Sequence, residues 1–229
     1  MSARRIGVAA LCALAGLGVS ASAAGAATVK NGKFENDNLN GWEKDFFGGG
    51  FWSTYEGVYP GDMKPRGPKG PLTVPPPPQG QFGAISDQGD PGAGFLSQVV
   101  KLERGKTHKL KFKLAYANQN TGPAMRGGFP PGFHTPKSFK FGKAARPNQQ
   151  FRMDVMKPGA PIKSLKKKKV LERVYITERG DPNRRGYRTI KEDLSEYAGD
   201  KVRLRFAFVV TEAPLNVGID GVRIKSKTD

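Results

Sequence analysis

Apolar and polar residues alternate with a period of two along much of this chain. Within 109–116 the even-numbered positions are apolar and most of the odd-numbered ones are lysines, and 201–208 repeats the alternation with lysine and arginine. Successive side chains of a strand point to opposite faces, so each segment predicts a β-strand with one buried face and one cationic solvent face.

Further apolar segments of strand length are separated by Gly and Pro, and no long stretch has the helical period. The strands we expect are 28–35, 51–58, 80–86, 94–102, 107–118, 149–156, 169–177, 187–193, 201–211 and 217–225. The number and spacing of these segments predict an all-β fold, an antiparallel two-sheet β-sandwich.

Two long connections interrupt the strands, at about 59–79 and 119–147. Loops of this length in compact domains are often functional or disordered. The first contains four consecutive prolines, Pro75 to Pro78, which favour a stiff polyproline II arm. This arm either folds against the surface or docks a proline-reading partner.

The N-terminus has the order of a secretory signal peptide over 1–27. Arg4 and Arg5 precede an apolar run, and small residues follow, with cleavage expected near Ala26 or Ala27. We therefore expect a secreted protein with a single domain over 28–229 and no transmembrane segment. The sole cysteine, Cys12, is lost with the signal, which excludes disulfides and thiol chemistry from the mature chain.

The chain is strongly basic, with a formal charge of +18 that falls to +16 when Arg4 and Arg5 are removed. Such a charge attracts polyanions. The basic residues that could form one patch are Lys109, Lys111, Lys113, Lys166, Lys167, Lys168, Lys169, Arg203 and Arg205. Because the basic strands lack interleaved aromatics, nucleic acid is a less suitable partner than another anionic polymer. The alternative is a solvated face that protects sheet edges.

Several motifs resemble those of galactose-binding-like jelly-roll domains, the β-sandwich of many carbohydrate-binding modules. The resemblance rests on Asn31-Gly-Lys-Phe-Glu35 with Gly41-Trp42, on 96–102, on 150–155, on 193–199 and on 218–224. Segments 77–80, 86–92 and 148–150 are similar to a group of exported bacterial proteins of this fold whose role is unassigned. The resemblance implies the fold and places Trp42 in the core.

The same resemblance implies a structural calcium site. Its matching positions are Glu35 and Asp220, and Asp220 lies in an otherwise aliphatic strand, where a buried carboxylate needs a cation or several donors. Gly221 stands where the family often has a second acid. The alternative is that backbone amides satisfy Asp220 and that Glu35 pairs with a basic residue.

A sugar ligand requires aromatic faces and amide or carboxylate groups. The segment 42–59 holds seven aromatics, and at least one of Phe47, Trp52, Tyr55 and Tyr59 is expected at an exposed position. Asp87, Gln88 and Gln149 either line the same site or bind loop backbone.

Catalytic motifs are missing from the sequence. The two histidines, His108 and His134, form no zinc pair, and there is no nucleophile elbow or phosphate-binding loop. We therefore expect a non-catalytic module that binds a glycan or polysaccharide. The alternative hypothesis is a structural or adhesion protein held to anionic surface polymers through its basic face.

Overall fold

The computed structural model describes residues 27–48, 50–59, 73–87, 92–118, 150–177, 181–182, 184–210 and 215–228. The predicted signal peptide, apart from Ala27, most of the first long connection and all of the second lie outside these residues. Among the described residues no helix is long and apolar enough to cross a membrane.

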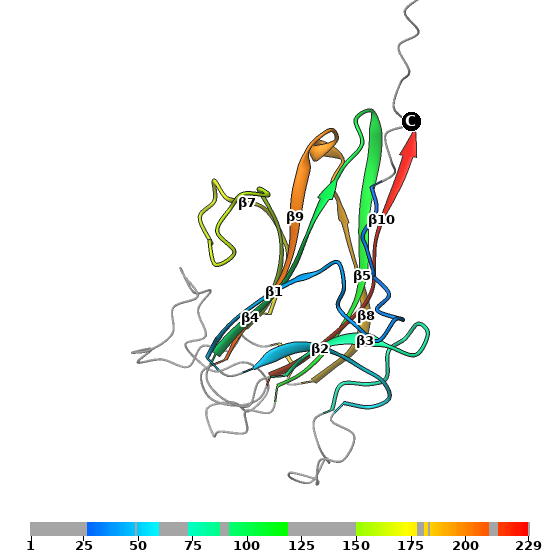
Figure 1. Ribbon diagram of the computed structural model, residues 1–229, viewed down its shortest axis with the longest axis vertical. Coiled ribbons are helices and arrows are strands. Elements are labelled where there is room, and N and C mark those ends of the chain that lie inside the picture. The colour runs from blue at the N-terminus through cyan, green and yellow to red at the C-terminus, as the bar shows by residue number, and fades with distance from the viewer. Residues whose placement is uncertain are drawn as a thin grey trace, which may run out of the picture.

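The fold is a sandwich of two antiparallel five-stranded sheets, as the alternation predicts (Figure 1). Sheet A has the order β1-β4-β9-β6-β7, and sheet B has the order β2-β3-β10-β5-β8. The strands are β1 Glu43–Gly48, β2 Phe51–Tyr55, β3 Gly83–Asp87, β4 Gly92–Lys101, β5 Lys106–Asn118, β6 Gln150–Met156, β7 Val170–Ile176, β8 Arg184–Asp193, β9 Lys201–Val210 and β10 Leu215–Thr228.

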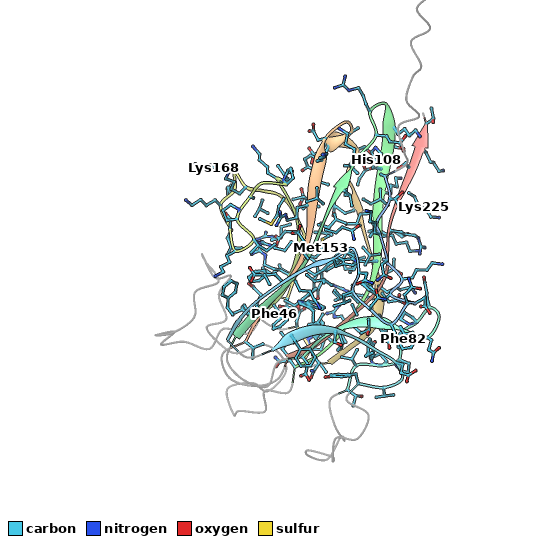
Figure 2. All side chains as sticks on the ribbon, in the orientation of Figure 1. Phe46, Phe82, His108, Met153, Lys168 and Lys225 are labelled. Carbon is cyan, nitrogen blue, oxygen red and sulfur yellow. The ribbon has the colours of Figure 1, made fainter. Side chains whose placement is uncertain are left out.

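The core lies between the inner faces of the two sheets. Phe112 of β5 and Phe206 of β9 are fully buried, and their ring centroids lie 5.2 Å apart. Met153 of β6 lies in the same layer, between the sheets (Figure 2). Trp42 is buried against Phe34 and Phe206, which confirms its predicted place in the core.

The first predicted strand, 28–35, is wrong, because this segment forms turns. Asn31 and Phe34 have positive φ, and the Asn31 side-chain amide donates to the carbonyl of Asn38 at 2.8 Å. These local hydrogen bonds compete with a strand ladder. The first strand of the structure is β1, which the sequence analysis did not identify.

Candidate functional site

A depression of about 370 Å³ lies on the outer face of sheet A. It is lined by Glu43, Lys44, Asp45, Phe95, Ser97, Ile162 and Arg203. Its size falls in the range of ligand pockets in proteins, although toward the small end.

The register of sheet A brings the polar groups of the depression together. Glu43 of β1 pairs with Ser97 of β4, and Asp45 pairs with Phe95. Val99 of β4 pairs with Arg203 of β9. Because alternate residues of a strand share a face, these side chains rise from three adjacent strands on one side of the sheet.

The floor of the depression is apolar. Phe95 belongs to a small cluster with Ala93, Ala207 and Val209 on the outer side of sheet A, and Phe47 packs edge-on against it with ring centroids 5.9 Å apart. Small residues flank Phe95, so the segment that follows β6 can pack over the sheet, where it contributes Ile162.

Charged and hydroxyl groups rim this floor. Arg203 Nη1 lies 3.6 Å from Glu43 Oε2, and Glu43 is 68% exposed. The Ser97 hydroxyl donates to the same carboxylate at 3.5 Å. The Nε of Arg203 is buried and has no hydrogen-bond partner among the described residues. The depression therefore combines carboxylate acceptors and a partly buried guanidinium around an apolar floor.

A buried ion cluster holds the wall of the depression. Arg205 donates through Nη2 to Asp154 at 2.5 Å and through Nη1 to the carbonyls of Ile162 and Ser164, the latter at 3.0 Å. Arg152 donates through Nε to the same carboxylate at 2.7 Å. Burial is the main cause that lowers the pKa of Arg205, which Asp154 opposes. The expectation that Arg205 lies in an exposed cationic row is wrong, because segment 157–169 covers it.

The four aromatic residues predicted to line a sugar site lie in different environments in the structure. Trp52 is 2% exposed and packs on Phe208 in the core, and Tyr55 is 5% exposed, so neither presents a ring face to solvent. Phe47 is half-buried, with the ammonium of Lys163 over its ring. The exposed aromatic of this stretch is Phe51, which alternation places on the opposite side of β2 from Trp52.

Tyr59 and Asp87 belong to an internal hydrogen-bond network on the outer face of sheet B. Asp87 accepts from the Tyr59 hydroxyl and, at 2.9 Å, from the Asn216 side-chain amide. Nearby, the Tyr55 hydroxyl donates to the carbonyl of Pro75 at 2.8 Å and lies 2.5 Å from the Tyr187 hydroxyl. Burial raises the pKa of Tyr55 above its ordinary value.

This network anchors the proline segment and the ends of the neighbouring loops. The donors to Asp87 are side chains and not the loop backbone of the alternative interpretation, and the role of Asp87 in sugar binding stays a prediction. Gln88 and Gln149 lie outside the described residues.

The two candidate calcium ligands lie on either side of Gly80. The backbone N–H of Gln79 donates to Asp220 at 3.1 Å, and that of Gln81 donates to Glu35 at 2.9 Å. A Cβ on Gly80 would lie 2.2 Å from the Glu35 carboxyl, and φ of Gly80 is +68°, so the turn requires glycine.

Asp220 is buried with one carboxylate oxygen unsatisfied. Its Oδ1 has no hydrogen-bond partner among the described residues. Burial raises the pKa of Asp220 to about 6, while the N–H groups of Gly221 and Gln79 lower it. The described residues hold no group of three or more acidic, His or Cys side chains fit for a metal, so a cation here would also need amide or backbone oxygens.

The predicted basic residues do not form one patch. Lys109, Lys111 and Lys113 are on β5 of sheet B, whereas Arg203 is on β9 of sheet A. Lys166 to Lys169 lie in the connection between β6 and β7, and Figure 2 shows Lys168 on the opposite side of the molecule from Lys225. A single patch is therefore wrong, because the outer faces of the two sheets point away from each other.

The histidine that the structure describes is buried and hydrogen-bonded through both ring nitrogens. His108 Nδ1 lies 2.9 Å from the Ser226 hydroxyl, and Nε2 lies 2.8 Å from the carbonyl of Glu103. These contacts fix the end of β5 against β10. His134 lies outside the described residues.

Glu43, Asp45 and Ser97 were missed by the sequence analysis. The signal that could have found them is the alternation in 43–47, where odd positions are acidic or aromatic on one face and Phe46 packs into the core from the other. Recognising it requires knowing that this short segment is a strand.

No protein-family model and no curated protein sequence matches the chain. Among solved structures, a family 61 carbohydrate-binding module in complex with β-1,4-galactotriose matches with a TM-score of 0.50 and 11% identity, over 89% of this chain and 100% of that one. The CBM22-1 xylan-binding domain from Paenibacillus barcinonensis Xyn10C matches with a TM-score of 0.40 and 10% identity, over 86% and 92%.

A family 11 carbohydrate-binding module from Clostridium thermocellum, in complex with a β-1,3-1,4-mixed-linked tetrasaccharide, matches with a TM-score of 0.38 and 11% identity, over 86% and 94%. At these identities the comparison with the family 61 module shows a shared fold. The chain has the jelly-roll fold of carbohydrate-binding modules, as its motifs indicated.

Proposed function

We propose that this protein is an exported, non-catalytic carbohydrate-binding module whose binding site is the depression on sheet A. The observation that carries the proposal is the arrangement of Glu43, Asp45 and Arg203 around an apolar floor. Carboxylates and a guanidinium supply acceptors and donors for sugar hydroxyls. Because Phe95 beneath them is fully buried, the partly exposed Ile162 supplies the apolar contact for a sugar ring.

The structural neighbour with β-1,4-galactotriose supports an oligosaccharide as the first class of ligand to test. Because a jelly roll hosts several activities, the shared fold supports the class and the depression supports the site.

The test is titration of the mature chain with neutral galactan, xylan and mixed-linked glucan oligosaccharides at high salt. The variant Glu43→Gln/Asp45→Asn removes two anionic acceptors from the rim. We expect it to lose roughly tenfold or more in affinity, since hydrogen bonds to charged groups contribute about 1.5–3 kcal/mol each.

The matched control is Glu56→Gln/Asp200→Asn, which makes the same chemical changes at exposed positions that do not line the depression. It should bind as the unaltered chain does. Equal losses in both variants, or no retention of any neutral glycan, would contradict the proposal.

We also propose that Glu35 and Asp220 hold a structural calcium ion. The support is the buried, unsatisfied Oδ1 of Asp220 beside a second carboxylate. The Gln79 side chain lies against Gly221 and offers an amide oxygen. When bound, the cation would satisfy the buried carboxylate and tie the proline segment to β10.

A further inference from the structure

Among the side chains that the structure describes, seven basic ones share the outer face of sheet B. Three lie on β5, three on β10 and one on β8, and we call them the cationic face: Lys109, Lys111, Lys113, Lys191, Arg223, Lys225 and Lys227. Figure 2 shows the Lys225 side chain projecting from this side of the sandwich. The three lysines of β5 were expected from the alternation in 109–116, and the other four were not expected.

The strand register places these charges directly opposite one another. Lys111 pairs with Arg223 on β10 and with Lys191 on β8, and Lys109 pairs with Lys225. Like charges directly opposite each other across a sheet are destabilising. The pKa of Lys111 is accordingly lowered, first by Arg223, then by desolvation and by Lys191.

The acidic groups nearest the cationic face, Glu192, Asp193 and Asp220, offset its seven charges only in part. No described carboxylate forms a salt bridge with any of its seven members. Asp193, opposite Lys109, accepts hydrogen bonds from Ser195 N and Oγ at 2.9 and 2.5 Å. Asp220, opposite Lys113, is buried beneath the backbone of Gln79.

Edge protection does not explain the charges on β5. This strand is paired along its lysines with β10 on one side and with β8 on the other, so its backbone is not open to another molecule. Protection of a sheet edge therefore leaves the three central lysines of the face, those on β5, unexplained.

The face is also recessed. A depression of about 460 Å³ is lined by Lys109, Lys111, Lys191 and Lys225, together with Leu110, Glu192 and Asp193. The Nε of Arg223 is buried and has no hydrogen-bond partner among the described residues. An anionic group in this recess would meet several cations at once and would relieve their mutual repulsion.

The spacing and composition of the face favour one kind of polyanion. Alternate residues on a strand are about 6.6 Å apart, and neighbouring strands are about 4.8 Å apart, so the charges form a lattice on the scale of a sugar unit. The aromatic side chains on this side of sheet B, Tyr55, Tyr59 and Tyr187, pack together in the internal network and line no part of the recess, so they are not placed to stack bases along the lysines. Of the residues that the structure describes, the exposed large apolar ones are Phe51, Val58 and Val99, and none of them is on this face, which disfavours insertion into lipid.

We infer that the cationic face of sheet B is a second binding surface, separate from the depression on sheet A, and that it takes an acidic polysaccharide with a carboxylate on each sugar. The ligand lies across β8, β5 and β10 and is held by charge-assisted hydrogen bonds from lysine and arginine. This goes beyond the proposed neutral-glycan site, and neither site depends on the other.

The experiment measures binding of the mature chain to polygalacturonate and to its fully methyl-esterified form, at low and high salt. The variant Lys111→Gln/Lys191→Gln removes two central charges of the face. The control Lys157→Gln/Arg173→Gln removes two exposed charges elsewhere. We expect the unaltered chain to bind polygalacturonate and not its methyl ester, and to bind more weakly at high salt. The affinity should fall roughly tenfold or more in the first variant and less than about twofold in the control.

Equal losses in the two variants would overturn the inference, since net charge alone would then account for binding. Binding of single-stranded DNA or phosphatidylserine vesicles that matches polygalacturonate in affinity and in sensitivity to the first variant would overturn the assignment to a polysaccharide. No retention of polygalacturonate would also overturn it. The sheet A variant changes different residues and is tested with neutral glycans at high salt, so either proposal can fail without the other.

Discussion

Trp52 was expected at an exposed binding surface, and the structure places it in the core. In the sequence it lies among aromatics and glycines that suggest an exposed binding surface. In the sandwich, Trp52 packs on Phe208 of β9 in the opposite sheet, and only 2% of its surface is exposed. Its neighbour Phe51, one position earlier on β2, is 46% exposed.

The contrast between buried Trp52 and exposed Phe51 predicts how truncating each side chain affects stability. Trp52→Ala should lower the free energy of unfolding by about 3–5 kcal/mol, because it removes a large buried ring and leaves a cavity. Phe51→Ala should change stability by only about 0.5 kcal/mol, as expected for an exposed position. Chemical denaturation of the two variants checks this, and similar losses in both would contradict the burial of Trp52.

At the scale of elements, the connection 157–169 depends on side chains of the sheet beneath it. Arg205 of β9 and Asp154 of β6 face each other across paired strands, and the arginine reaches the carbonyls of Ile162 and Ser164. This ion cluster sets where the connection crosses sheet A and therefore where the depression has its wall.

Asp154→Ala should destabilise the protein by about 3–5 kcal/mol, because it leaves two arginines buried without their carboxylate. Trypsin should then cut within 163–169 faster than in the unaltered chain, since the clamp on the connection is lost. The triple variant Arg152→Met/Asp154→Leu/Arg205→Met should lose less stability than Asp154→Ala. The opposite order of stability would show that the cluster is not the source of the effect.

The strands also show which elements could be predicted from the sequence. Segments such as β5 and β9 are long and alternate strictly, and their bounds differ from the expected ones by only a residue. β1 is short and begins with charged residues, so its pattern is weak. The expected strand at 28–35 failed because Asn31 and glycine favour local turns that outcompete pairing with a sheet.

At the scale of the whole molecule, Asp220 couples the proline segment, the turn at Gly80 and the last strand. Without a bound cation its pKa is raised to about 6 by burial, above the ordinary value of 3.8. The unfolded chain therefore loses this proton at lower pH than the folded protein does. The contribution of Asp220 to the free energy of unfolding is fully present below about pH 4 and falls as pH rises to about 6.

Calcium should reverse this loss, because a cation stabilises the ionised carboxylate. We expect the midpoint of thermal unfolding to rise on adding calcium to chelator-treated protein at pH 7 and to remain unchanged at pH 4. Asp220→Asn should abolish both the calcium increment and the fall in stability between pH 4 and 6. A calcium increment that persists in this variant would place the ion elsewhere.

The sequence by itself determined the fold class, most strand positions and the buried place of Trp42, because these depend on local alternation and on motifs contiguous in the chain. It also pointed to Glu35 and Asp220, which the turn at Gly80 brings together. Their role as calcium ligands remains a prediction.

Only the tertiary structure decided which side chains share a surface. Lys111 and Arg203 lie in strands of nearly identical pattern, yet β5 belongs to sheet B and β9 to sheet A, so their side chains face opposite sides of the molecule. Likewise Glu43, Ser97 and Arg203 meet through the order β1-β4-β9. Alternation tells which face of a strand is polar, but strand order and register are set by non-local packing, and the binding surfaces are made of those non-local neighbours.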